Sequence, residues 1–195
     1  MLLFESPSAA KEAYPTAERE FHRSKTEDKE FRQGLLEKYP NARKVLKPSE
    51  REVVRSMYKA IKNNEWASEA LSSGGTTQDV LIGKFPGFGL KVKAKLDMTS
   101  PSGVCIADLK STWHSNEDSF KNSVIDYGYH IQAAWYSDLH TVLTDICPSF
   151  VFLCVSSSEP HNVWVTTLPP YLIAAGRKHY EDLIRLYIRN TEGGK

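Results

Sequence analysis

The stretch KAKLDMTSPSGVCIADLKST, residues 93–112, decides the fold that this sequence predicts. Its two halves alternate apolar and polar residues, as β-strands do when only one of their faces is buried. The loop at Thr99–Gly103, rich in Thr, Ser, Pro and Gly, lets the two strands lie side by side. Asp97 ends the first strand on the face opposite the core, while Asp108 and Lys110 share one face of the second. We therefore expect Asp97 and Asp108 to converge at neighbouring strand ends.

Periodic patterns continue on both sides of these strands. Ser49 followed by Glu52 indicates a capping box at a helix start, and Pro86-Gly87-Phe88-Gly89 supplies the turn chemistry of a hairpin. The expected elements, in chain order, are a helix at about 49–72, hairpin strands at 79–85 and 90–98, a strand at 104–111, a helix from 117 to about 141, strands at 150–156 and 163–167, and a helix at 170–190. This order predicts an α/β fold, a central mixed β-sheet flanked by helices.

Composition predicts a single domain overall. The chain has 195 residues, of which 41% are hydrophobic and 25% charged, enough for one full core. Residues 1–47 are charged and interrupted by prolines, so we expect a charged N-terminal helical extension there and the core at 48–195. The formal net charge is only +1, so any contact with nucleic acid must use local patches.

The start of the chain and the cysteines indicate a cytoplasmic protein that makes no membrane contact. The opening MLLFESPSAAKEAYP has too few consecutive apolar residues for a signal peptide or a membrane span. Cys105, Cys147 and Cys154 lie mostly in apolar runs and form no CxxC pair, as expected of reduced thiols rather than ligands of zinc or iron.

Two carboxylates at adjacent strand ends, with a lysine beside them, are suited to binding a hard cation. Asp97 and Asp108 would supply oxygen ligands for Mg²⁺ or Mn²⁺. The ion would generate an attacking hydroxide, and Lys110 could position water or offset charge in the transition state. Phosphodiester hydrolysis is the reaction that this set favours. The alternative is a salt bridge between Asp108 and Lys110, or a solvated strand end.

A run of lysines and two hydroxyl residues next to these acids indicate a surface that faces phosphate. Residues 84–95 contain lysines at positions 84, 91, 93 and 95 and no acid, and Lys93 and Lys95 lie nearest to Asp97. Ser111 and Thr112 extend the strand of Lys110 with hydroxyls that could also bind phosphate. An ordinary solvated strand face and plain sheet residues are the alternatives.

A second polar pair follows on the predicted long helix. Gln132 and Tyr136 are four residues apart and so share a helix face, directly after Tyr127-Gly128-Tyr129. Apolar neighbours surround Gln132 in the sequence, so the helix is expected to be buried on several sides, and a buried glutamine needs a hydrogen-bonding partner.

Taken together, residues 89–138 resemble the PD-(D/E)XK nuclease superfamily. The pattern is K-x-K-x-D, then DLKST at 108–112, then YGYHIQAAWY at 127–136. Within the superfamily, the series is most similar to the RecE-type phage exonucleases, which are related to lambda exonuclease and to the RecB nuclease domain. A looser similarity extends from Pro48 to the C-terminus.

The resemblance implies a restriction-endonuclease-like core and a role for each matching residue. Asp97 and Asp108 match the metal-binding acids, Lys110 matches the catalytic lysine, and the carbonyl of Leu109 matches an additional metal ligand. Gln132 and Tyr136 match a motif that helps to hold DNA.

The implied activity is Mg²⁺-dependent digestion of one strand of linear double-stranded DNA, from its 5′ end toward its 3′ end. The remaining 3′ single strand would pass to a single-strand annealing protein in phage-type recombination. Relatives of this type commonly assemble as ring-shaped homo-oligomers, so a ring is expected here as well.

The sequence departs from the resemblance at two places. An N-terminal helix with a histidine or glutamate precedes the sheet in these relatives, and this chain begins just after it, with His22 as the nearest histidine. Many relatives also have a glutamate at the start of the first hairpin strand, where this chain has Thr77, Gln78 and Asp79. Two alternatives therefore stay open: a truncated or degenerate nuclease domain that binds DNA or a recombination partner without cutting, and a structure-specific endonuclease on the same fold.

Overall fold

A computed structural model describes residues 12–192 of the chain, with side chains to residue 191. The chain forms two compact units that divide between Lys59 and Ala60, and each unit is described by itself. The boundary expected at residue 47 remains a sequence-based prediction.

The first unit has a small core of its own. It contains a short 3-10 helix, Thr26–Asp28, the helix α2, Lys29–Lys38, and most of α3, Pro48–Asn63. The buried side chains of its core are those of Ala17, Phe21 and Leu35.

The start of α3 differs from the predicted capping box. Glu50 accepts a hydrogen bond from the backbone N–H of Lys47 at 3.0 Å, directly before the proline that opens the helix. Ser49 does not cap the helix. Its N–H and its hydroxyl both donate to the Glu20 carboxylate, at 2.6 and 3.0 Å. The predicted pairing of Ser49 with Glu52 is therefore wrong.

The helix predicted at 49–72 is two helices, α3 and α4, Glu65–Ser72. Asn64 between them has an extended backbone, with φ −79° and ψ 123°, and its side chain accepts from the N–H of Ala67 at 3.0 Å. Asparagine is among the residues that best start a helix in this way, so the break has a local cause.

A five-stranded mixed sheet forms the centre of the second unit, as predicted. Its order is β1-β2-β3-β4-β5. The strands are β1, Thr76–Lys84, β2, Lys91–Thr99, β3, Cys105–Thr112, β4, Ser149–Ser156, and β5, Val163–Thr167. Only the β3–β4 pair in this sheet is parallel, and the chain between these two strands forms helices, as a parallel crossover requires.

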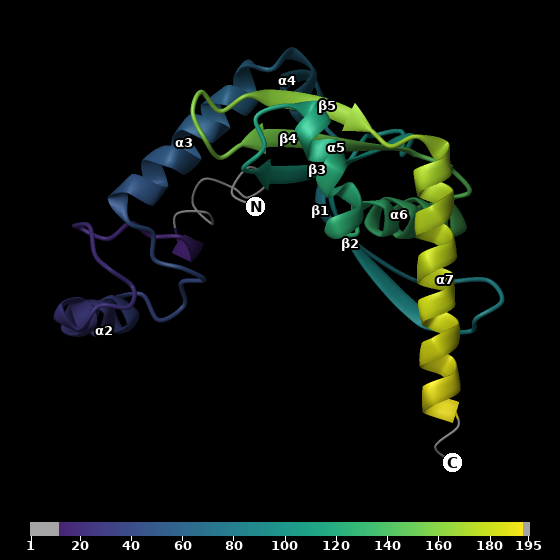
Figure 1. Ribbon diagram of the computed structural model, residues 1–195, viewed down its shortest axis with the longest axis horizontal. Helices are drawn as coiled ribbons and strands as arrows, with labels where there is room; N and C mark the ends of the chain where they lie inside the picture. The colour runs from purple at the N-terminus through teal and green to yellow at the C-terminus, as the bar shows by residue number, and fades with distance from the viewer. Residues whose placement is uncertain (1–11, 193–195) are drawn as a thin grey trace. The chain divides into compact units, whose positions relative to one another are not determined.

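The crossover contains two helices where the sequence predicted one helix from 117 to about 141. They are α5, Glu117–Asp126, and α6, Tyr129–Thr144. Gly128 separates them with φ 66°, a left-handed conformation that glycine adopts without the steric cost of a side chain. Figure 1 shows α6 beside the strands and the long helix α7, Pro170–Glu192, next to α6. Among the described residues, none of the helices combines the length and apolar character needed to cross a membrane.

The main core lies between the sheet and these helices. Phe120 of α5, Leu139 of α6, and Leu96, Ile106 and Phe152 of the sheet have no exposed surface. Burying side chains of this size contributes about 1.5–3 kcal/mol each to folding. This packing fixes the positions of β2, β3 and α6, which carry the residues of the candidate site.

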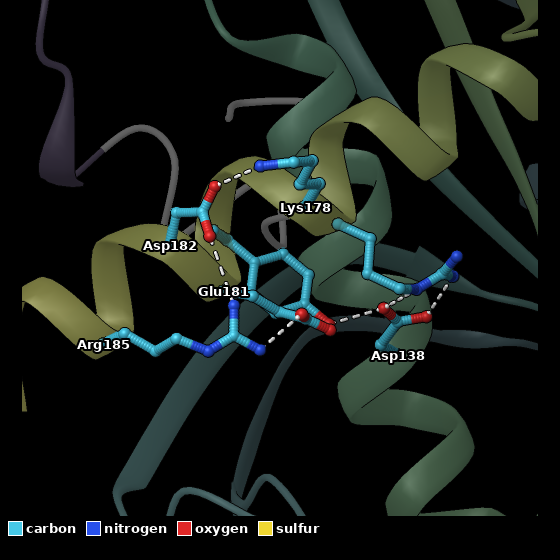
Figure 2. A network of polar contacts seen from close by, with 7 residues as sticks. Asp138, Lys178, Glu181, Asp182 and Arg185 are labelled. Atoms are coloured by element: carbon cyan, nitrogen blue, oxygen red, sulfur yellow. Dashed lines mark hydrogen bonds and ion pairs between the residues drawn. The ribbon is translucent and has the colours of Figure 1, made fainter.

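Two contacts hold α7 against α6. At Gly176 the backbones approach so closely that a Cβ would lie 2.1 Å from the carbonyl oxygen of His130. Asp138 of α6 accepts hydrogen bonds from both Arg177 and Tyr180, at 2.6 Å each. Figure 2 shows Asp138 beside α7, which also carries the exposed Lys178–Asp182 ion pair.

Candidate active site

Asp97 is held at the end of the β2–β3 pairing. The β2–β3 ladder pairs Met98 with Ala107 and Thr99 with Ile106. Asp97 is the residue directly before Met98, and its carboxylate reaches across to β3. Its Oδ2 accepts from the backbone N–H of Leu109 at 3.0 Å. The expected approach of Asp97 to the strand of Asp108 is therefore present, although the link runs through the backbone of the residue after Asp108.

Gln78 of β1 holds the other oxygen of Asp97. Its Nε2 donates to Asp97 Oδ1 at 3.1 Å. Because Thr77 pairs with Met98 and Asp79 pairs with Leu96, Gln78 stands opposite Asp97 in the hairpin register. Its φ of 55° is left-handed, a conformation uncommon in residues with a side chain. The fixed orientation of Asp97 therefore depends on donors from both neighbouring strands.

Asp108, Lys110 and Gln132 form a closed set of contacts. Lys110 Nζ lies 2.6 Å from Asp108 Oδ2 and donates to Gln132 Oε1 at 2.7 Å. Gln132 Nε2 donates to Asp108 Oδ1 at 2.6 Å. Strand β3 positions the acid and the lysine on one face, and α6 supplies the glutamine, so the partner that a buried glutamine needs is present.

This set is buried, which differs from a solvated strand end. The side chains of Asp108 and Lys110 are only 5% and 15% exposed. Lys110 Nζ lies 4.4 Å from the ring centroid of Tyr129, the first residue of α6. The salt bridge that was the alternative interpretation of Asp108 and Lys110 exists, and it lies under α6 rather than in water.

Burial is the largest influence on the ionisation of Asp108. Desolvation raises the pKa of this carboxyl, and the negative charge of Asp97 raises it further. The positive charge and hydrogen bond of Lys110 and the hydrogen bond from Gln132 act in the opposite direction without cancelling the rise. Asp108 therefore carries a charge that the folded protein stabilises less well than water does.

Tyr136, the second half of the predicted helix motif, lies one helix turn after Gln132 and is half-buried. Its ring packs edge-on to Phe150, with the ring centroids 6.2 Å apart. Burial raises the pKa of its phenol, and the side-chain hydrogen bond with Gln132 lowers it, ahead of the raising effects of Asp108 and Asp97. The phenol is therefore close to both acids.

The predicted phosphate-facing lysines line the outer side of the hairpin. Lys93 and Lys95 are exposed and stand opposite Ile82 and Val80 of β1. Within residues 12–192, neither lysine forms an ion pair with an acid. Exposed ammonium groups that lack a protein counter-ion are available to a polyanion.

The two hydroxyl residues after Lys110 differ from one another. Ser111 is exposed. Thr112 is half-buried, and its Oγ1 accepts from the backbone N–H of His114 at 3.2 Å, which shapes the end of β3. The structure thus gives Thr112 a local structural contact in addition to its predicted role toward DNA.

The sequence analysis names Gln78 and Tyr129 but does not predict their contacts with Asp97 and Lys110. The contact of Gln78 with Asp97 depends on a left-handed backbone at a residue inside strand β1, and the sequence pattern of the strand does not signal it. Tyr129 lies under the Lys110 ammonium because α6 begins there, and its only sequence signal is the glycine before it. His22, the nearest N-terminal histidine, lies in the first unit, where its backbone N–H donates to Asp28 at 2.7 Å.

The available oxygens fit a lightly coordinated divalent ion. Among the described residues there is no group of three or more His, Cys, Asp or Glu side chains that could hold a metal. Mg²⁺, however, is usually bound through one or two carboxylates and keeps several waters. Asp108 Oδ2 is buried and, within residues 12–192, has no aligned hydrogen-bond donor besides its ion pair. A divalent ion bound by Asp97 and Asp108 would supply positive charge next to this oxygen.

Comparison with solved structures supports the fold. A crystal structure described as a "putative exonuclease", from Eubacterium rectale, superposes with a TM-score of 0.63 at 19% sequence identity. The similarity covers 83% of this chain and 62% of that chain, so this chain spans less than two thirds of that protein. No curated protein matches the sequence.

Comparison with protein families supports the superfamily. Residues 7–195 match the family described as "PDDEXK-like domain of unknown function (DUF3799)". The resemblance to the PD-(D/E)XK superfamily is thereby confirmed, and the restriction-endonuclease-like arrangement of sheet and helices agrees with it. The closer assignment to RecE-type exonucleases stays a prediction. The chain belongs to the PDDEXK-like family.

Proposed function

We propose that this protein is a metal-dependent DNA nuclease that hydrolyses phosphodiester bonds. The observation that carries the proposal is the contact set of Asp108, Lys110 and Gln132 beside the oriented carboxylate of Asp97. A purely structural ion pair would not need a second acid whose charge raises the pKa of the first. Membership of a PDDEXK-like family adds independent support.

Asp97 and Asp108, with the carbonyl of Leu109, are the groups that would hold Mg²⁺ or Mn²⁺. When bound, the ion supplies activation of a water molecule and neutralisation of charge on the phosphate. The protein's contribution is to orient the acids. Gln78 and the Leu109 N–H fix Asp97, while Gln132 fixes Asp108 from the opposite side.

Lys110 is placed to act on the substrate as well as on Asp108. Its ammonium has three donors, and Asp108 and Gln132 engage two of them at most. The remaining N–H can donate to a phosphate oxygen or orient the attacking water. The Tyr129 ring beneath the ammonium attracts it through a cation–π contact and so restricts its movement.

The outer face of the β1–β2 hairpin is the surface that we assign to the DNA backbone. Lys84 and Lys91 stand directly opposite each other, and Lys93 and Lys95 follow on the same strand face. Like charges placed opposite each other destabilise a hairpin, so a stretch of this kind is better explained by a polyanionic partner than by folding. Asp97 lies two residues after Lys95 on this strand, so DNA bound along the lysines would run toward the two acids.

The finer activity that we propose is digestion of linear double-stranded DNA from the 5′ end, leaving 3′ single strands. This step, the transfer of the product to a single-strand annealing protein and the assembly of a homo-oligomeric ring are supported by the RecE-like motif at residues 89–138. Ser111, Gln132 and Tyr136 would contact the bound strand beside the acids.

The test compares cleavage of linear and circular duplex DNA in the presence of Mg²⁺ or Mn²⁺. We expect nucleotide release from the linear form only, and a loss of about 100-fold or more in Asp108→Ala and Lys110→Ala, the scale on which single charge-stabilising groups act. Asp182→Ala and Lys178→Ala are matched controls, because they remove the same two residue types from an ion pair on α7 (Figure 2). Equal cleavage by all four variants would contradict the assignment, and cutting of the circle would indicate an endonuclease.

A second candidate is a DNA-binding domain that does not cut. Gln78, an amide, occupies the position opposite Asp97 where an acid would complete a third ligand. Retention of DNA by the protein in moderate salt, with no cleavage under any divalent ion, would favour this candidate. Gain of metal-dependent cleavage in Gln78→Glu would then show that one missing carboxylate accounts for the inactivity.

A further inference from the structure

Two large aromatic side chains that lie near Lys110 or Tyr129 in the sequence are exposed. Trp113, three residues after Lys110, has 69% of its surface exposed, and Tyr127, before the start of α6, has 61%. Leaving rings of this size in water forfeits the stabilisation that burial would give. Exposed aromatic rings beside a candidate active site can serve as stacking platforms for the bases of a nucleic acid.

Each exposed ring already has one face covered by a second ring at a low angle. Trp113 lies on His114, with centroids 4.0 Å apart and planes inclined by 31°. Tyr127 lies on Tyr129, at 5.6 Å and 30°. A stack with one open face is the arrangement that another flat ring completes.

Both stacks connect to the candidate active site. Tyr129 is the ring beneath the Lys110 ammonium. From Tyr129, ring contacts run to Phe120 at 5.5 Å and from Phe120 to His114 at 6.4 Å. His114 is buried, and neither of its ring nitrogens has a hydrogen-bond partner within residues 12–192, so its ring serves as a packing surface beneath Trp113. The exposed rings are thus the two outer ends of one aromatic series that passes under Lys110.

We propose that Trp113 and Tyr127 stack on unpaired nucleotides of the DNA at the site of cleavage. The inference rests on the proposed function, and it adds a preference for DNA with a frayed or single-stranded end over fully paired DNA. Nucleobases are flat on both faces and every base can stack, so two exposed rings would hold single-stranded DNA without reading its sequence. The ammonium of Lys110, together with the exposed Lys93 and Lys95, which form no ion pair within residues 12–192, favours a ligand that carries phosphate along with its rings.

The test measures DNA binding rather than cleavage. Fluorescence anisotropy in EDTA is recorded with a fluorescein-labelled blunt hairpin duplex and with the same duplex carrying a 5′ or a 3′ single-stranded tail. We expect the tailed probes to bind more tightly than the blunt probe. Trp113→Ala and Tyr127→Ala should each weaken binding of the tailed probe by about 5- to 100-fold, the effect of removing one base–aromatic stack.

Two matched variants separate the loss of base stacking from the loss of an exposed ring elsewhere on the protein. Tyr171→Ala removes an equally exposed ring, 71%, at the start of α7, and it should leave the affinity for every probe unchanged. Trp113→Phe keeps a ring and should restore most of the affinity that Trp113→Ala loses. The salt dependence of binding should not change in either Trp113 variant, because stacking releases no counter-ions.

The outcomes distinguish the inference from the function on which it rests. If the blunt probe binds and the tails add nothing, or if Tyr171→Ala weakens tail binding as much as Trp113→Ala does, the inference is wrong while the proposed function stands. If no probe binds at any salt concentration, both are wrong. Tighter binding of the tailed probes that disappears only in Trp113→Ala and Tyr127→Ala supports the inference even when the protein does not cut.

Discussion

The side chain of Gln132 on α6 hydrogen-bonds the side chain of Asp108 on β3 across 2.6 Å. The same amide accepts from Lys110 at 2.7 Å, so one glutamine satisfies an acid and a base at once. An amide is the side chain that can do this, because it offers a donor and an acceptor and carries no charge. The helix is thereby coupled to the strand at the point where the chemistry is proposed.

Removal of that amide is expected to destabilise the fold and reduce cleavage. Gln132→Ala leaves an oxygen of the buried Asp108 without its donor, which costs about 1–3 kcal/mol in the free energy of unfolding. Urea denaturation followed by circular dichroism measures the change. Gln33→Ala is the control, since its exposed amide donates to the exposed Glu37, and a change below about 0.5 kcal/mol is expected. Equal effects of the two substitutions would contradict the role given to Gln132.

The ionisation of Asp108 predicts how stability depends on pH. Burial raises its pKa above 3.8, the ordinary value for an aspartate, so the folded state binds this proton more tightly than the unfolded state does. The contribution of Asp108 is therefore greatest below pH 3.8 and declines as pH rises through the folded-state pKa. Asp108→Asn cannot lose a proton. Its stability relative to the wild type should rise with pH across that window, as measured by urea denaturation at a series of pH values.

An exposed aspartate provides a control of opposite sign. The hydrogen bond from Lys178 lowers the pKa of Asp182, so its contribution is present above pH 3.8 and is lost as pH falls through the folded-state pKa. The stability of Asp182→Asn relative to the wild type should therefore not rise with pH. If Asp108→Asn and Asp182→Asn followed the same pH dependence, burial would not be the cause of the Asp108 effect.

The left-handed backbone of Gln78 predicts that glycine is more stable than alanine at this position, the reverse of the usual order in a strand. Gln78→Ala and Gln78→Gly both remove the hydrogen bond to Asp97, but only glycine relieves the φ of 55°. A left-handed conformation costs a residue with a side chain roughly 1–2 kcal/mol, so Gln78→Gly should be more stable than Gln78→Ala by about 1 kcal/mol. Glycine in an ordinary strand would be the less stable of the two. Thermal and urea denaturation of both variants decide between these orders.

The same pair of variants also tests how Asp97 is oriented. Both should lower the affinity for Mn²⁺, measured by electron paramagnetic resonance of the free ion, because Asp97 loses one of its two donors. Gln78→Asn, whose side chain is one methylene shorter, should not restore the affinity for Mn²⁺. An unchanged affinity for Mn²⁺ in Gln78→Gly would show that the contact serves only the hairpin.

The sequence allowed the strands to be predicted more accurately than the helices, for physical reasons. Alternation placed β2 at 90–98 and the structure has Lys91–Thr99, because a strand with one buried face repeats every two residues. The long helices were predicted without their interruptions at Asn64 and Gly128. Each interruption depends on a single residue, and a helical pattern of apolar residues that spans several turns does not reveal it.

The contacts of the candidate site also divide into those that the sequence could predict and those that it could not. The approach of Asp97 to the strand of Asp108 follows from register, so the sequence could predict it. The burial of Lys110 over the Tyr129 ring depends on where α6 packs, and the contact of Gln78 depends on one unusual backbone angle. Neither is encoded in a local pattern, and both were found only in the structure.

The contact between α6 and α7 gives the last prediction. A Cβ at position 176 would lie 2.1 Å from the carbonyl oxygen and 2.5 Å from the carbonyl carbon of His130, and a backbone cannot move aside as a side chain can. Gly176→Ala should therefore lower the free energy of unfolding by about 3 kcal/mol, the upper part of the usual range for overpacking. Gly34→Ala in α2 is the same change where a Cβ meets nothing within 4 Å, and it should raise stability by about 0.5–1 kcal/mol through helix propensity. Urea denaturation followed by circular dichroism measures both. A neutral Gly176→Ala would mean that α7 does not pack on α6 as closely as the structure shows, and that side-chain contacts such as those of Asp138 with Arg177 and Tyr180 hold the two helices together.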